Sequence, residues 1–293
     1  HEPAAFLCAL LNSQPMGFYA PAQLVRDARA HGVEVTGVDV RFSDWDSTLE
    51  RDRDSTAAPS LRLGMRLVRG LSTQAARRLC QTREQDGPFR DVADLARRAR
   101  LDRGSLRALA DAGALAGIGG HRRRAWWQVL GIEARGPLLA STPARESTPD
   151  LPAPSEAEDL LGDYRGLGLS LGRHPLALLR PRLRQQGFRP ATELADHGHR
   201  RIARAAGLVI NRQRPGAAGG VVFLTLEDET GSVNVVIWKD LAERQRPQVI
   251  GARLLGVIGI WEQRDDVCHL VAGRLEDHSH LLGELQTRSR DFH

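Results

Sequence analysis

Apolar residues follow a helical spacing through the first part of the chain and an alternating, strand-like spacing in the last part. The early pattern predicts helices at 4–11 and 21–31, each ended by a glycine or proline turn, and a short strand at 33–35. The stretch 44–60 is polar and rich in turn residues, so we expect a boundary or an exposed hairpin there.

A helical pair is predicted around Gly70. Apolar residues at 61, 65 and 68 predict one helix, and those at 75–80 predict a second, for which Ser72 is the N-cap. Two short helices with a tight glycine turn form a helix-hairpin-helix, whose free amides and helix dipole suit a phosphate oxygen. The alternative is an ordinary corner between two helices with no ligand. Besides Gly70 and Ser72, the candidate contacts are Arg66, Arg69, Leu71, Thr73 and Arg77.

A second helical pair is predicted at 92–100 and 106–110, with Asp102 as a cap. A basic run at 121–124 follows and leads into Trp126 and Trp127. Arginines beside tryptophans are suited to gripping a nucleic-acid backbone and stacking on bases, which makes Arg122 and Arg123 candidates. In the alternative interpretation one tryptophan belongs to the core and the arginines cover it.

Five prolines among Ser, Thr and Ala mark residues 134–155 as a linker, and Ser155–Glu158 has the spacing of a capping box. Short helices are expected after it, up to about residue 196. We therefore divide the chain into 1–50, 51–133, the linker 134–155, a helical connector 156–199, a barrel domain 200–276 and a tail 277–293.

The barrel domain is predicted from a change of period near Arg204. Three strands, a helix and two more strands are expected, at 204–210, 221–226, 233–238, 240–248, 252–261 and 267–272. This is the order of an OB-fold, a five-stranded barrel, although a barrel of another family has similar parts. The fold class is thus multidomain α+β, with a helical part followed by a five-stranded OB-fold barrel.

The second and third strands of an OB-fold and the neighbouring loops face the ligand. Alternation places Val222, Leu224 and Leu226 inside, so Phe223 and Thr225 face outward. Phe223 is then either a stacking surface for bases or, alternatively, part of the barrel packing. The candidates for single-stranded DNA are Arg212, Arg214, Phe223, Thr225, Asn234, Trp238 and Lys239.

Charge is unevenly distributed along the 293 residues. Residues 51–130 contain 17 Arg against 8 Asp and Glu, a local net charge of +9, whereas the whole chain carries +5. Such a block indicates a face for a polyanion, or alternatively a solvated helix surface in an arginine-rich protein. Three widely separated cysteines predict free thiols in a reducing cytoplasm, and no targeting or membrane-spanning segment is visible.

Motifs for catalysis are missing from the sequence. It contains no GxxxxGK[ST], HExxH or GxSxG motif and no His/Cys cluster at zinc spacing. The pair Asp44 and Asp46 lacks a supporting third carboxylate for a metal site. The residues alone therefore predict a nucleic-acid-binding protein without a catalytic site or metal of its own.

Several segments, in order along the chain, resemble bacterial C-family DNA polymerases, the replicative polymerase III alpha subunits and their relatives. Residues 4–6, 10–19, 31–35, 38–40 and 43–45 are similar to the end of the fingers. The following helix-hairpin-helix part is matched by 61–65, 68–72, Phe89, 94–95 and 112–115, and the OB domain by 221–238. Residues 169–176 and 289–293 resemble the error-prone branch of the family.

The resemblance implies the carboxy-terminal part of an error-prone polymerase that acts in translesion synthesis and damage-induced mutagenesis. The palm domain with its acidic triad and Mg²⁺ would lie upstream, and the opening without Met also leads us to expect a longer polypeptide. Primer–template DNA, single-stranded DNA, accessory translesion proteins and, through them, the sliding clamp would be partners in the bacterial cytoplasm, at the nucleoid. The alternatives are a standalone DNA-binding repair protein and a structural hub that recruits translesion proteins.

Overall fold

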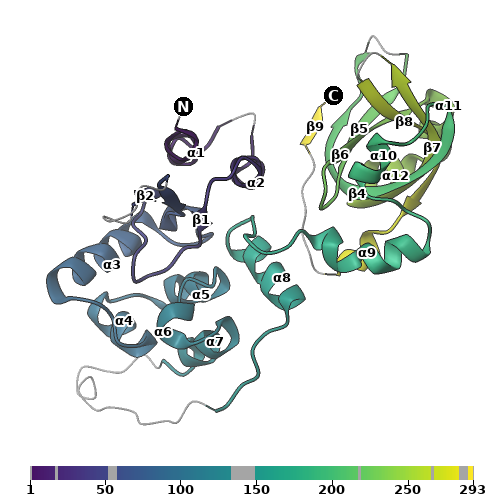
Figure 1. Cartoon of the computed structure of the whole chain (residues 1–293). Coiled ribbons are helices and arrows are strands. Elements are labelled where there is room, and N and C mark those ends of the chain that lie inside the picture. Colours follow the sequence, from purple (N-terminus) through teal and green to yellow (C-terminus); the bar gives the residue numbers. More distant parts are fainter. Residues whose placement is uncertain are drawn as a thin grey trace. The chain divides into compact units, whose positions relative to one another are not determined.

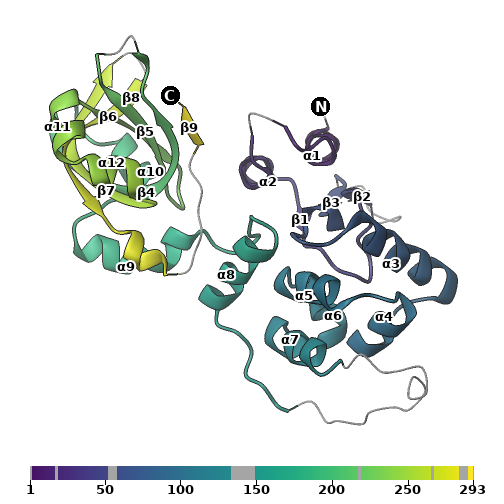
Figure 2. The same cartoon turned by 180° about the vertical axis from the view of Figure 1, so that it is seen from behind.

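A computed structural model describes residues 2–16, 19–51, 58–132, 149–216, 219–264, 267–283 and 290–292. The chain forms two compact units, 1–172 and 173–293 (Figures 1 and 2). The domain boundaries given above all fall inside one or the other of these units, and they stay predictions. The described helix and strand bounds of the first unit are α1 Pro3–Asn12, α2 Pro21–Ala30, β1 Val35–Thr36, β2 Thr48–Glu50, β3 Ser60–Arg62, α3 Thr73–Asp86, α4 Val92–Arg98, α5 Arg103–Asp111, α6 Ala116–Gly119, α7 Arg122–Leu130 and α8 Glu156–Gly166.

The first unit packs these helices and a small sheet around one hydrophobic core. β3 is the central strand, parallel to β1 and antiparallel to β2, so the polar stretch 44–60 contains a hairpin. Fully buried leucines come from α1 (Leu11), β3 (Leu61), α3 (Leu79) and α5 (Leu109), and Leu169 after α8 joins them. The core therefore contains residues from both sides of the predicted boundary at residue 50, and also Leu169, which follows the predicted linker.

The helix predicted from apolar residues 61, 65 and 68 is wrong. Ser60–Arg62 is strand β3, and Met65–Leu67 is a single 3₁₀ turn. Leu61, Leu63 and Met65 are all fully buried, so a period of two fits this segment as well as a helical period. Pairing with β1 and β2, which are distant in sequence, makes this segment a strand rather than a helix. The helix after the glycine turn is present as α3, with Ser72 as its N-cap.

The second unit is a closed barrel preceded by α9 Pro175–Gln185 and α10 Ala191–Ala195. Its elements are β4 Arg201–Gln213, β5 Val222–Glu227, β6 Ser232–Ile237, α11 Lys239–Arg244, α12 Arg246–Gly251, β7 Leu254–Arg264, β8 Val267–Asp277 and β9 Arg290–Phe292. β4 pairs with both β5 and β7, and β6 lies parallel to β8. The circular order β4-β5-β6-β8-β7 is that of an OB-fold.

Alternation along β5 and β6 fills the barrel. Val222, Leu224 and Leu226 point inward, as predicted, and Val233, Val235 and Ile237 of β6 meet them. β7 and β8 approach each other closely at Gly259. A Cβ at this position would lie 2.0 Å from the carbonyl oxygen of Val271, so only glycine fits. The register shifts at this glycine, which marks a β-bulge.

Candidate nucleic-acid interface

The glycine turn before α3 leads into a helix whose first amides are open. Gly70 has a φ of +83°, a conformation that favours glycine, and the Ser72 hydroxyl accepts a hydrogen bond from the Ala75 amide at 3.1 Å. Within the described residues, the amides of Thr73 and Gln74 have no acceptor. These amides form the open first turn of a 14-residue helix, whose dipole favours an anion.

The arginines beside this turn mostly hold the fold together. Arg66 pairs with Asp46 at 3.0 Å and donates to the carbonyl oxygen of Asn12, which fastens the turn to α1. Arg69 donates to the carbonyl oxygen of Tyr164 at 3.0 Å, near the end of α8. Leu71 is buried. The two guanidinium groups therefore contact the protein itself, and the roles of Arg66, Arg69 and Leu71 in binding phosphate stay predictions.

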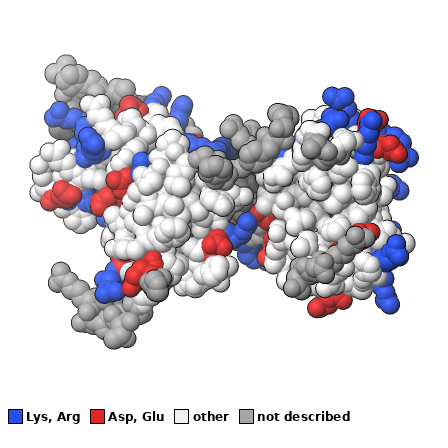
Figure 3. Space-filling model, turned by 90° about the horizontal axis from the view of Figure 1, so that it is seen from above, with Lys and Arg blue, Asp and Glu red and all other residues white. Residues whose placement is uncertain are grey.

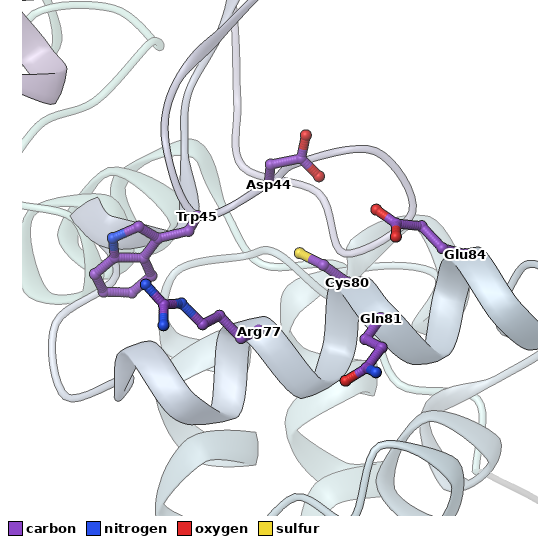
Figure 4. Close-up of a pocket in the computed structure, with 6 residues that line it drawn as sticks. All are labelled: Asp44, Trp45, Arg77, Cys80, Gln81 and Glu84. Carbon is purple, nitrogen blue, oxygen red and sulfur yellow. The ribbon is translucent and has the colours of Figure 1, made fainter.

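Arg77 differs from these arginines. It is exposed on α3, and within the described part of the chain it has no hydrogen-bonded or ionic partner. Figure 4 shows its guanidinium pointing toward the Trp45 ring across a shallow pocket that Asp44, Cys80, Gln81 and Glu84 also line. Burial raises the pKa of the Cys80 thiol. Arg77 is therefore the basic candidate beside the turn that remains available.

The basic run at 121–124 binds α8. Arg122 contacts both Asp159, at 3.0 Å, and Asp163, and its side chain is only 13% exposed. Arg123 pairs with Glu158 at 2.7 Å. The interpretation with one tryptophan in the core fits better, because Trp126 packs against the core and donates to Asp111 at 2.9 Å, whereas Trp127 is 51% exposed. Arg122 is thus a structural residue here rather than a free DNA contact.

The barrel presents an outward row of aromatic and aliphatic residues next to a polar row. Phe223 of β5 lies opposite Val236 of β6, and Thr225 lies opposite Asn234. Phe223 is 40% exposed, and the Thr225 hydroxyl donates to the Asn234 side-chain oxygen at 3.3 Å. This confirms the predicted outward orientation of Phe223 and Thr225. A π surface beside amide and hydroxyl groups is suited to stacking and hydrogen bonding with unpaired bases.

Cations and a second aromatic ring gather at one end of this face. Trp238, 58% exposed, follows directly after β6, and it continues the outward alternation of Asn234 and Val236. Lys239 is exposed next to it, and its Cγ lies 3.1 Å from the position that a Cβ on Gly220 would take. Arg214 is exposed at the same barrel end, directly after β4, and has no partner among the described residues.

Arg212, a predicted contact for single-stranded DNA, donates hydrogen bonds to the protein itself. It lies opposite the inward Leu224, and its guanidinium donates to the carbonyl oxygens of Val249, at 2.9 Å, and Ala252. These carbonyls belong to the last turn and the C-cap of α12, where backbone acceptors lack helical partners. Arg212 therefore caps a helix across the barrel end.

Two residues of these surfaces were missed by the sequence reasoning. Arg107 is exposed on α5 beside Ala108, whose Cβ lies 3.8 Å from where a Cβ on Gly70 would stand. Its position on the polar side of an amphipathic helix was the available signal. Val236 completes the outward row of the barrel, and the same alternation that identified Phe223 could have identified it.

Basic side chains do not form a continuous stripe on the face shown in Figure 3, where Lys and Arg lie in separate groups beside acidic residues. Within the described residues, no three His, Cys, Asp or Glu side chains are grouped as for a metal ion. No helix in that part of the chain is long and apolar enough to cross a membrane. The interface is therefore assigned from local geometry and not from overall charge.

The two units match two nucleic-acid-related families. Residues 32–125 match the helix-hairpin-helix motif, and residues 203–277 match an OB-fold nucleic acid binding domain. The chain is 62% identical over its whole length to an error-prone DNA polymerase of Alkalilimnicola ehrlichii and 56% identical to that of Azoarcus sp.. The chain is homologous throughout to a segment of the error-prone DNA polymerases. It spans 28% of the length of each of these relatives.

This similarity confirms the resemblance to the error-prone branch, and the two family matches confirm that a helix-hairpin-helix part precedes an OB-fold part. A solved structure, asparaginyl-tRNA synthetase from Pyrococcus horikoshii, matches 29% of this chain and 21% of its own, with 24% identity and a TM-score of 0.26. A score this low supports no inference about function.

Proposed function

We propose that this chain is the DNA-binding part of an error-prone polymerase that acts in translesion synthesis. The homology over the whole chain carries this proposal, because it joins a hairpin unit and an OB barrel in the order found in those polymerases. The open amides before α3, with Arg77 and Arg107, bind phosphates of the primer–template duplex. The outward face of β5 and β6 binds the single-stranded template.

Catalysis belongs to parts of the polymerase outside this chain in this proposal, where an acidic palm site holds Mg²⁺. Accessory translesion proteins, and the sliding clamp through them, remain proposed partners. The standalone DNA-binding protein stays as an alternative. A native polypeptide near 32.2 kDa in its own cells would favour that alternative, whereas a product several times larger favours the polymerase.

Duplex and single-strand binding are tested separately by fluorescence anisotropy at increasing salt. The logarithm of affinity should fall linearly with the logarithm of salt, with a slope of about −0.9 per duplex phosphate contact and about −0.7 per single-strand contact. A hub without DNA affinity would give no binding at any salt concentration. Salt-independent binding would contradict the proposed phosphate contacts.

Lys239 gives a direct probe of the barrel face because it is the sole lysine of the chain. An oligonucleotide with one abasic site carries an aldehyde, which condenses with the Lys239 amine to an imine and water. Cyanoborohydride then delivers a hydride and leaves a stable secondary amine. We expect a covalent adduct that the variant Lys239→Arg loses while it keeps its charge. An equal yield from the variant would place the bound strand elsewhere.

A further inference from the structure

The pocket beside Arg77 lies on the same face of α3 as the open amides of the hairpin turn. That face is marked by spacings of three, four and three residues, which align Gln74, Arg77, Gln81 and Glu84. Arg77 lies about 6 Å along the helix axis from Thr73, because each residue adds about 1.5 Å. A DNA strand whose phosphate meets the amides would therefore pass the pocket with its next nucleotide.

The size and the lining of the pocket suit a planar polar group. Its volume is about 350 Å³, within the range of sites for small ligands. The half-buried Trp45 ring packs against the core of the first unit and lines the pocket with the part that stays open. An indole ring held in this way offers a stacking surface to a nucleobase.

Hydrogen bonds fasten the loop that carries Trp45 to the segment before the glycine turn. The amide of Met65 donates to the carbonyl oxygen of Asp44 at 2.8 Å, and the amide of Arg66 donates to that of Trp45 at 2.9 Å. From α3, Arg83 pairs with the Asp44 carboxylate at 2.6 Å. The ring therefore has a fixed place beside α3 before any ligand binds, which lowers the cost of binding.

The charges of the pocket are ordered along α3. Figure 4 shows Trp45 and Arg77 at one end of the pocket and the Glu84 carboxylate at the other. The end with Arg77 is also the one nearer the positive end of the helix dipole. A group with an anion at one end and hydrogen-bond donors at the other fits this order. A nucleotide whose base carries an exocyclic amino group has both, whereas thymine lacks the amino group.

We propose that this pocket receives the base of an unpaired nucleotide in the DNA strand that the hairpin holds. Trp45 stacks on the base, Arg77 contacts its phosphate, and Glu84 accepts a hydrogen bond from the amino group. The inference rests on the proposed duplex contact of the first unit and adds a site for a nucleotide without a pairing partner. A free nucleotide has the same chemistry, but a strand also brings the second phosphate that the open amides can hold.

The test measures the affinity of the 293-residue chain for three labelled duplexes by fluorescence anisotropy. One duplex is fully paired, one has a single unpaired adenine, and one has a single unpaired thymine. The parent chain should bind the duplex with the unpaired adenine at least about fivefold more tightly than the paired one, the size of a weak stacking contact. The unpaired thymine disturbs the duplex in a similar way, so a smaller gain for thymine separates the pocket from DNA bending.

Two variants assign the gain to the pocket. Trp45→Leu should abolish the gain for the unpaired adenine and keep the affinity for the paired duplex. Phe42→Leu is the matched control, because this exposed ring of the same loop lies outside the pocket, with the guanidinium groups of Arg41 and Arg62 at 5.0 and 5.2 Å. Glu84→Gln, at an exposed position, should reduce the preference for adenine over thymine without affecting the fold. Melting temperatures of all variants check that the first unit stays folded.

Equal affinity of the parent for the paired and the adenine duplex would overturn the inference, and so would a gain that survives Trp45→Leu. Free deoxyadenosine monophosphate should not displace the adenine duplex, because it lacks the second phosphate. Displacement at micromolar concentration would make the pocket a site for a free nucleotide and overturn its assignment to the DNA strand.

Failure of the inference differs from failure of the proposed function. If the parent chain binds none of the duplexes, or if Gly70→Ala leaves the affinity for the paired duplex unchanged, the hairpin contact itself is wrongly assigned. If Gly70→Ala weakens binding of the paired duplex and the unpaired adenine brings no gain, only the role of the pocket is refuted.

Discussion

Arg180 should determine whether the β5–β6 hairpin stays in place. It lies on α9, is 8% exposed, and donates to Glu229 at 2.5 and 2.8 Å and to Asp228 at 3.0 Å. Both carboxylates belong to the turn that joins the two strands of the proposed binding face. We expect Arg180→Met to leave them buried without their cation.

The expected loss can be estimated from these contacts. Removing one partner of a buried ion pair typically costs about 3–5 kcal/mol. Asp228 keeps other donors in the variant, namely the amides of Ala191 at 2.8 Å, Thr230 at 2.7 Å and Gly231 at 3.0 Å. Glu229 is left with 16% of its side chain exposed. We therefore expect a loss of about 2–3 kcal/mol in the free energy of unfolding at pH 7.5.

The loss should depend on pH in a defined direction. Burial acts to raise the pKa of Glu229, but hydrogen bonds and the charge of Arg180 hold it below its ordinary value. In the parent protein this group adds stability above its unfolded pKa, and the contribution disappears as pH falls through the folded value. Without Arg180, less counteracts the effect of burial, so the pKa of Glu229 rises. Protonation of Glu229 at pH 5 then removes the buried negative charge that destabilises the variant. The difference between parent and variant should therefore shrink from pH 7.5 to pH 5.

Urea unfolding at both pH values, followed by circular dichroism and by hydrogen exchange of β5 and β6, measures this difference. Arg184→Met is the matched control on the same helix, since its pair with Glu193 is exposed and should contribute less than about 1 kcal/mol. The double variant Arg180→Met/Glu229→Gln should recover part of the loss. A loss equal to that of the control, or one that grows on acidification, would refute the reasoning.

Three further outcomes are expected. Phe223→Ala should weaken binding of oligo-dT by about 1–3 kcal/mol and spare duplex binding, whereas Ile250→Ala, at a more exposed apolar residue of α12, should change neither; anisotropy measures both. Gly70→Ala should cost about 1–2 kcal/mol through its left-handed backbone and weaken duplex binding. Gly87→Ala, at φ +78° and ψ −176° with open space around it, should cost at least as much stability with duplex affinity intact; equal affinity loss in both would argue against the hairpin contact. Arg122→Met should destabilise the first unit by about 2 kcal/mol in thermal unfolding, because Asp159 and Asp163 lose their buried partner. Arg123→Met should cost less than about 1 kcal/mol. A larger loss from Arg123→Met than from Arg122→Met would contradict the structural role of Arg122.

The sequence by itself determined the features that depend on residues close together in the chain. Ser72, Asp102 and Ser155 cap helices as predicted, because a cap and the amide it binds are three residues apart. Alternation gave the inward and outward faces of β5 and β6, since neighbouring side chains of a strand point to opposite sides. The order of strands and helix indicated the OB-fold, because each of these elements is visible as a local pattern of residues.

Only the tertiary structure decided how the arginines are used. Arg66, Arg122 and Arg212 all looked like free cations, yet each meets carbonyl or carboxylate groups about 40 or more residues away. The strand at 60–62 likewise depends on partners at 35–36 and 48–50. The position of an arginine in the sequence does not show which group its side chain will contact, because only the fold brings distant acceptors within reach. The same holds for β9, whose place beside β4 comes from pairing across almost eighty residues.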